Sequence, residues 1–188
     1  MTRTARLLLI LLVLFATATA GARTRNVTDP EAPRSLPAEG AVSVQWTDPA
    51  GFTDLKYSGN RWRASQGNWV YQLAEHLRES AEKHLPEGER LEVTITDIDR
   101  AGRYEPWGGV RLQDVRILRD HYPPSMKLEF RQFAADGTLL AEGSRELRDT
   151  GYLMGGSNIG THDNLYYEKR MVDEWVRDEM RRTSVASN

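Results

Sequence analysis

The feature that most constrains the fold is a regular alternation of apolar and charged residues in the second half of the chain. Residues 126–131 (MKLEFR) place every second side chain on an apolar face, the pattern of a strand with one buried and one exposed face. Asp136-Gly137 supplies a tight turn, and residues 139–147 continue as a partner strand. The alternation predicts an antiparallel hairpin in a sheet that helices cover on one face only.

The remaining elements follow from changes between the strand period and the helix period. Residues 42–46, 91–98 and 115–119 have the character of strands, whereas 68–85 and 164–182 carry apolar residues at helical spacing. The resulting order is strand, helix, four strands, helix. This order predicts an α+β fold, a two-layer sandwich in which a mostly antiparallel sheet of about five strands carries two helices on one face.

The N-terminus has the organisation of a cleavable secretory signal peptide. Arg3 and Arg6 precede an apolar run at 7–15, and small residues fill 16–22. The run is roughly half of the ~20 apolar residues that a membrane-spanning helix needs. We therefore expect residues 1–22 to be removed during secretion, which leaves a soluble periplasmic or secreted protein with no stable membrane anchor.

The rest of the chain divides into three parts. Cleavage is expected between Ala18 and Arg23, and the polar, proline-containing segment 23–40 is expected to be a flexible leader. Residues 41–182 form a single α+β domain in this interpretation. Residues 183–188 are small and polar, and we expect them to be a disordered tail.

Composition excludes several classes of protein. The chain has no cysteine, so it forms no disulfide, accepts no lipid through a thiol and depends on its apolar core for stability. Its 25 basic and 27 acidic residues give none of the basic excess that is typical of nucleic-acid binding or of electrostatic attachment to anionic lipid. No sequence pattern predicts a cofactor.

Several segments together resemble an uncharacterised bacterial family known as domain of unknown function 3016. The resemblance covers nearly the whole mature chain and implies a bacterial envelope setting, but no activity, substrate or cofactor. A looser likeness, of fold only, is to modules of envelope assembly lipoproteins, which carry a lipid-accepting cysteine that this chain lacks. The segments that resemble the family are FTDLKYSGNR at 52–61, residues 73–102, EPW at 105–107, VRILRDHYPP at 115–124 and YEKRMVDEW at 167–175.

One polar cluster follows the strand at 91–98. Two carboxylates beside an aromatic residue could hold a sugar or a hard cation, and paired carboxylates cleave glycosidic bonds when they flank a substrate. Residues that are two apart point the same way, however, and a calcium loop would need about six oxygen ligands. Ion pairs at a capped turn are the simpler interpretation. The cluster consists of Asp97, Asp99, Arg100, Arg103, Tyr104, Glu105 and Trp107.

Other potential sites are weaker. His76 and His84 are eight residues apart, which is too far for one metal on a helix, and no Gly-x-Ser-x-Gly elbow supports a serine nucleophile. The glycine-rich loop at 151–163 lacks the lysine of a phosphate-binding loop. Apolar residues of this loop, and an aromatic residue at the start of the last helix, could still contact a partner. They are Leu153, Met154, Ile159 and Tyr166.

The sequence therefore favours binding over catalysis. Our leading hypothesis is a non-enzymatic binding or envelope-assembly module that presents its sheet face, or the loop before its last helix, to an envelope protein. The alternative is a small hydrolase or carbohydrate-binding protein that uses Asp97, Asp99 and Trp107. Carboxylates that converge in a concave pocket would favour the alternative.

Overall fold

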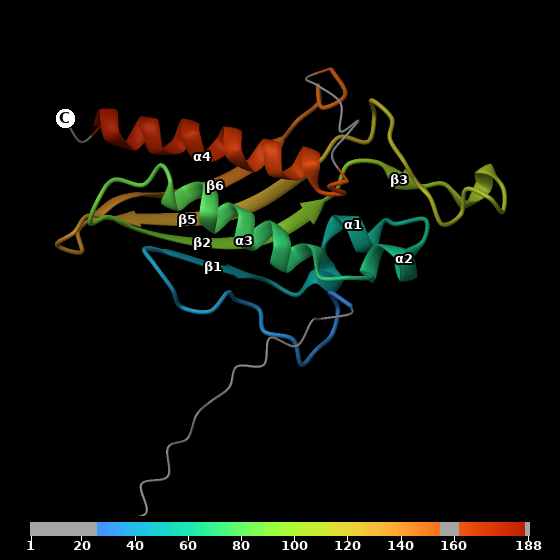
Figure 1. The fold of residues 1–188 in the computed structure, drawn as a ribbon, viewed down its shortest axis with the longest axis horizontal. Coiled ribbons are helices and arrows are strands. Elements are labelled where there is room, and N and C mark those ends of the chain that lie inside the picture. The colour runs from blue at the N-terminus through green and yellow to red at the C-terminus, as the bar shows by residue number, and fades with distance from the viewer. Residues whose placement is uncertain (1–25, 155–161, 187–188) are drawn as a thin grey trace, which may run out of the picture.

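The computed structural model describes residues 26–154 and 162–186, with side chains as far as Thr183 (Figure 1). The expected signal peptide, the first residues of the expected leader, and Ile159 lie outside the described residues. The helices are η1 (Pro49–Gly51), α1 (Thr53–Lys56), α2 (Arg61–Ser65), α3 (Trp69–Glu82), η2 (Pro106–Gly108) and α4 (Tyr166–Ala186). The strands are β1 (Val42–Trp46), β2 (Arg90–Asp99), β3 (Arg103–Tyr104), β4 (Arg116–Ile117), β5 (Ser125–Phe133) and β6 (Leu139–Arg148).

The fold is the predicted α+β sandwich with a mostly antiparallel sheet. The main sheet has the strand order β1-β2-β5-β6. The β1–β2 pair is parallel, and the β2–β5 and β5–β6 pairs are antiparallel. In the predicted hairpin, Phe130 lies opposite Gly143 and Phe133 opposite Leu139, so β5 and β6 are paired around the Asp136-Gly137 turn as expected.

The strand expected at 115–119 does not join this sheet. Only Arg116 and Ile117 form a strand, which pairs with β3 in a separate two-stranded ribbon. The main sheet accordingly has four strands instead of about five. The segment stays outside because the Arg116 side chain donates to the backbone oxygens of Arg100 and Ala101, at the point where the chain leaves β2.

Two long helices cover one face of the sheet. In Figure 1, α3 and α4 lie side by side across the strands. The apolar spacing that predicted α3 buries Leu73 and Leu77 completely, and Trp175 of α4 packs edge-on against Phe130 of β5 at a ring distance of 6.1 Å. The inward residues of β1, β2 and β5 are buried and their neighbours face outward. The opposite face of the sheet therefore carries mostly polar and charged side chains from these strands, together with Phe133.

The structure continues beyond residues 41–182 at both ends. From Asn26 onward the expected leader lies against the domain, with Val27 and Leu36 buried. The Leu36 N–H donates to the Val44 oxygen at 3.0 Å, and the Trp46 N–H donates to Arg34 at 2.8 Å, so this segment covers the free edge of β1. At the other end, α4 extends to Ala186.

None of the helices in the described part of the chain combines the length and apolar character that crossing a membrane requires.

Candidate functional site

A buried ionic network lies where β2 ends. Its centre is Asp54 of α1, whose side chain is buried between two arginines. Arg100 donates to Asp54 Oδ2 at 2.8 Å, and Arg116 donates to Asp54 Oδ1. Burial alone would raise the pKa of Asp54, but the charges of Arg116 and Arg100 outweigh it and lower the pKa below its ordinary value. The carboxylate therefore stays ionised and holds both cations in place.

Both arginines have further partners that join separate elements. Arg100 donates to the Ala64 oxygen of α2 at 2.9 Å, and its guanidinium lies 4.0 Å from the ring centroid of Trp69 on α3. Arg116 donates to the Ala101 oxygen at 2.7 Å. The network thus fixes α1, α2 and β4 against the end of β2 and the start of α3.

Two further acids stand around this centre. Glu168 of α4 accepts the Ala101 N–H at 2.6 Å, and burial raises its pKa. Asp99 is paired with Arg103 at 2.7 Å, yet desolvation outweighs this pairing and raises the pKa of Asp99 to about 6. One carboxylate oxygen of each acid has no hydrogen-bond partner among the described residues. Both acids therefore hold a proton more readily than an exposed carboxyl would.

The chain then leaves the sheet as a projecting segment, residues 105–119, which we call the arm (Figure 1). Its base is fixed by Glu105, which is 5% exposed and accepts from Arg119 at 2.8 and 2.6 Å and from the Tyr122 hydroxyl at 3.1 Å. The hydrogen bonds from Arg119 lower the pKa of Glu105. Tyr152 donates to the Arg119 oxygen at 2.9 Å. Hydrogen bonds therefore hold both the first and the last residue of the arm at its base.

The segment around α1 and α2 lies against the arm. Asn60 donates to the Gln113 oxygen at 3.0 Å, and Arg63 is paired with Asp114 at 3.0 Å. A Cβ at Gly59 would lie only 2.3 Å from the Tyr104 oxygen, so this approach requires glycine. The α1–α2 segment and the arm together form one surface.

This surface exposes large apolar side chains. Trp107 is 72% exposed and Val110 is 82% exposed, while Tyr57 and Trp62 on the adjacent segment are 63% and 62% exposed. Clusters of this kind on a folded protein mark sites of interaction with a partner or a membrane. We call the group the arm end; it consists of Tyr57, Trp62, Trp107, Val110, Leu112, Val115 and Leu118.

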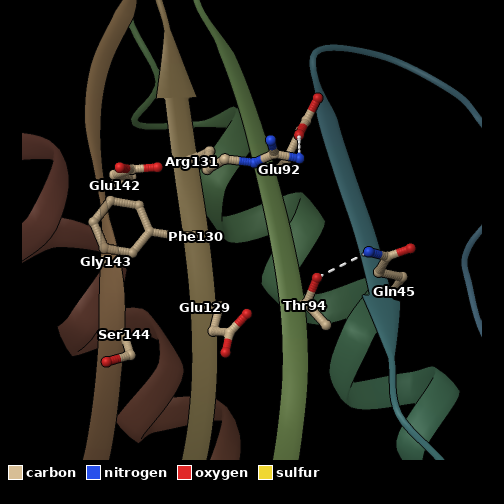
Figure 2. Close-up of a pocket in the computed structure, with 9 residues that line it drawn as sticks. All are labelled: Gln45, Glu92, Thr94, Glu129, Phe130, Arg131, Glu142, Gly143 and Ser144. Atoms are coloured by element: carbon tan, nitrogen blue, oxygen red, sulfur yellow. Dashed lines mark hydrogen bonds and ion pairs between the residues drawn. The ribbon is translucent and has the colours of Figure 1, made fainter.

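The open face of the sheet holds a second candidate, a shallow polar hollow of about 550 Å³. Figure 2 shows its lining side chains along the neighbouring strands. Arg131 is paired with Glu92 at 2.7 Å, and Gln45 donates to the Thr94 hydroxyl at 2.9 Å. Glu129 and Glu142 add two more carboxylates, so the lining is polar and mostly acidic. The full lining is Gln45, Glu92, Thr94, Glu129, Phe130, Arg131, Glu142, Gly143 and Ser144.

The structure separates the polar cluster that the sequence singled out. Asp97 accepts the Thr53 N–H at 2.6 Å and the Thr53 hydroxyl at 2.7 Å, whereas Asp99 binds Arg103 and Glu105 binds Arg119. Each carboxylate is thus held by a different donor. Arg100 belongs to the buried network, as does Tyr104, whose ring lies 5.5 Å from the Arg116 guanidinium; Trp107 belongs to the arm end.

The described residues expected in and before the last helix differ in exposure, and Tyr166 begins α4 as expected. Leu153 is 38% and Met154 91% exposed, and they follow Tyr152, which contacts the base of the arm. Tyr166 is partly buried against Tyr167, with ring centroids 5.3 Å apart. Within the described residues, no group of three or more acidic or histidine side chains is placed to hold a metal ion.

Sequence reasoning missed the centre of the network and every residue of the arm end except Trp107. Asp54 stands in the short apolar segment FTDL, where a buried carboxylate is the unusual feature that could have drawn attention. Arg116 and Glu168 carry no comparable signal, because their burial depends on contacts with distant parts of the chain. Trp62 lies on α2 and Tyr57 directly follows α1, and both helices are too short for a periodic pattern.

Comparison with known proteins adds one match. The model of a family described as "Protein of unknown function (DUF3016)" matches residues 40–178, a span that includes the buried network and the arm. No curated protein and no solved structure matches the chain.

Proposed function

This chain belongs to the DUF3016 family of proteins of unknown function, and from that premise we propose that it is an exported, non-enzymatic module of the bacterial envelope. In this proposal it acts by docking onto another envelope component through the arm end. Export follows from the signal-peptide pattern of residues 1–22. Docking follows from the exposed side chains of the arm end.

This proposal rests on one observation: the arm exposes large apolar side chains to water, yet hydrogen bonds hold its base in place. Trp107 and Val110 are among the most exposed apolar residues described, and leaving such side chains in water lowers the stability gained on folding. The arm that bears them is nevertheless fixed at its base by Glu105, Arg119 and Tyr122. A supported apolar projection is typical of a surface that becomes covered by a partner.

The arrangement of carboxylates gives no support to the alternative, a hydrolase or carbohydrate-binding protein. Catalysis on a glycosidic bond needs two carboxyl groups that face one substrate. Asp97 is bonded to Thr53 on α1, and Asp99 is paired with Arg103. The hollow described above does not include either acid.

Site-specific crosslinking tests the docking proposal. A photoreactive residue replaces Val110 in cells that export the protein, and a matched control carries it at Leu139, which is 45% exposed at the opposite end of the sheet. We expect a crosslinked product, with protein or lipid, from position 110 and none from position 139. No product from position 110, or equal products from both positions, would contradict the proposal.

A further inference from the structure

Residues 53–65 and 105–119, which form the α1–α2 segment and the arm, together contain six basic and three acidic residues. Lys56, Arg61 and Arg111 lie on α1, on α2 and in the arm, and the described part of the chain contains no ion-pair partner for any of them. The whole chain, by contrast, has a formal net charge of −2. The net charge thus conceals a local surplus of cations beside the exposed apolar side chains.

These cations accompany the residue types that favour a membrane interface. Trp and Tyr rings concentrate at the headgroup level of a bilayer because they have an apolar body and a polar edge. Lysine and arginine near an anionic surface each add about a fivefold gain in partitioning. Trp62, Tyr57 and Trp107 are all more than half exposed, so the arm end offers both kinds of contact.

The projecting shape of the arm end also suits a lipid surface. The arm end gathers seven exposed apolar residues on a segment that projects from the end of the sheet (Figure 1). A fluid headgroup layer can surround such a projection without a complementary cavity.

We propose that the arm end docks on the anionic surface of a lipid bilayer. Trp62 and Trp107 enter the headgroup layer, and Lys56, Arg61 and Arg111 lie against lipid phosphates. This inference rests on the proposed docking function and names its partner. The association is peripheral and reversible, because no long apolar segment of the described chain accompanies it.

Tryptophan fluorescence provides a specific test. Of the five tryptophans, Trp46, Trp69 and Trp175 are at most 7% exposed, whereas Trp62 and Trp107 are 62% and 72% exposed. The protein is purified from the exported fraction and mixed with vesicles of phosphatidylcholine and phosphatidylglycerol. We expect the emission to shift to shorter wavelength, and we expect this shift to disappear in the variant W62F/W107F.

Co-sedimentation with the same vesicles measures the contribution of charge. The variant K56Q/R61Q/R111Q should partition about a hundredfold less than the original protein. The control K83Q/R177Q/R182Q removes the same residue types from exposed positions on the α3–α4 layer and should partition normally. Equal loss in both variants, or equal binding to pure phosphatidylcholine vesicles, would overturn the proposal.

The outcomes separate this inference from the function on which it rests. Crosslinks from position 110 to a protein, together with no binding to anionic vesicles, would overturn the lipid inference and leave the docking function standing. Absence of both crosslinks and vesicle binding would overturn both.

Discussion

The two ends of the central sheet are completed in different ways. At one end, β5 and β6 are joined by a short polar turn in which Gly137 has a φ of 87°, and Asp136 accepts the Thr138 N–H at 2.9 Å. At the other end, α1, α2 and the arm surround the end of β2, and Asp54 is buried between Arg100 and Arg116. Only the second end contains buried charged side chains and exposed aromatic rings.

The difference separates what the fold requires from what it does not. A turn such as the one at Gly137 is sufficient to connect two antiparallel strands. The arm is far longer than that, and its exposed residues contribute little to the core. We infer that the buried network exists to hold the arm, and that the arm exists to present its exposed residues.

The largest effect is expected from Asp54→Ala. This change leaves the charges of Arg100 and Arg116 in a buried site without their carboxylate, which costs about 3–5 kcal/mol. Urea unfolding measures the loss, with Asp178→Ala as the control, because Asp178 is a partly exposed partner of Arg181 on α4 and should contribute less than about 1 kcal/mol. Similar losses in both variants would show that the network has no special role.

A smaller effect is expected from the pH dependence of Asp99. Because burial raises its pKa to about 6, the folded protein binds this proton more tightly than the unfolded chain does. Stability from this group is therefore present below about pH 4 and is lost as the pH rises through about 6. The variant Asp99→Asn does not lose this stability, because its side-chain amide does not titrate.

The difference in unfolding free energy between Asp99→Asn and the original protein should consequently move by about 2 kcal/mol in favour of the variant between pH 4 and pH 7. Unfolding in urea at a series of pH values measures it. A difference that is constant with pH would contradict the raised pKa. Burial also raises the pKa of Glu168, so Glu168 too loses stability as the pH rises. Its contribution is the same in both proteins and cancels from the difference.

A local effect is expected from Glu105→Gln. The change removes the charge that binds Arg119 and Tyr122, so the arm should open more often while the core stays folded. Trypsin should then cut after the exposed Arg111 several-fold faster. Glu92→Gln, which removes an ion pair with Arg131 on the open face, is the control, and equal cutting of the two variants would show that Glu105 does not fix the arm.

The smallest effect on stability is expected at the arm end itself. The double variant W107S/V110S changes side chains that are 72% and 82% exposed, so its unfolding free energy should differ by less than about 0.5 kcal/mol. Its binding to anionic vesicles should nevertheless be lost. A loss of stability as large as that of Asp54→Ala would mean that these side chains belong to the fold.

The elements that the sequence predicted are those whose partners are close along the chain. The β5–β6 hairpin depends on alternation and a two-residue turn, and α3 depends on spacing within one helix. The separate β3–β4 ribbon was missed, because only the long-range bonds of Arg116 to Arg100, Ala101 and Asp54 hold its second strand away from the sheet.

The candidate site was predictable only in part, for the same reason. Trp107 could be identified as a candidate because it follows a polar cluster at the end of a strand. Tyr57 and Trp62 could not, because their place beside the arm depends on Asn60 and Arg63, which contact residues more than fifty positions later. Burial of Val27 depends in the same way on a backbone bond to Ser65.

Hydrogen exchange in the presence of envelope membranes tests the central claim most directly. The measurement compares amide exchange across the chain with and without isolated membranes that retain their proteins. We predict slower exchange in residues 105–118 and in the α1–α2 segment, with no change in β5 and β6. Protection confined to the open face of the sheet, or no protection anywhere, would contradict the assignment of the arm end as the docking surface.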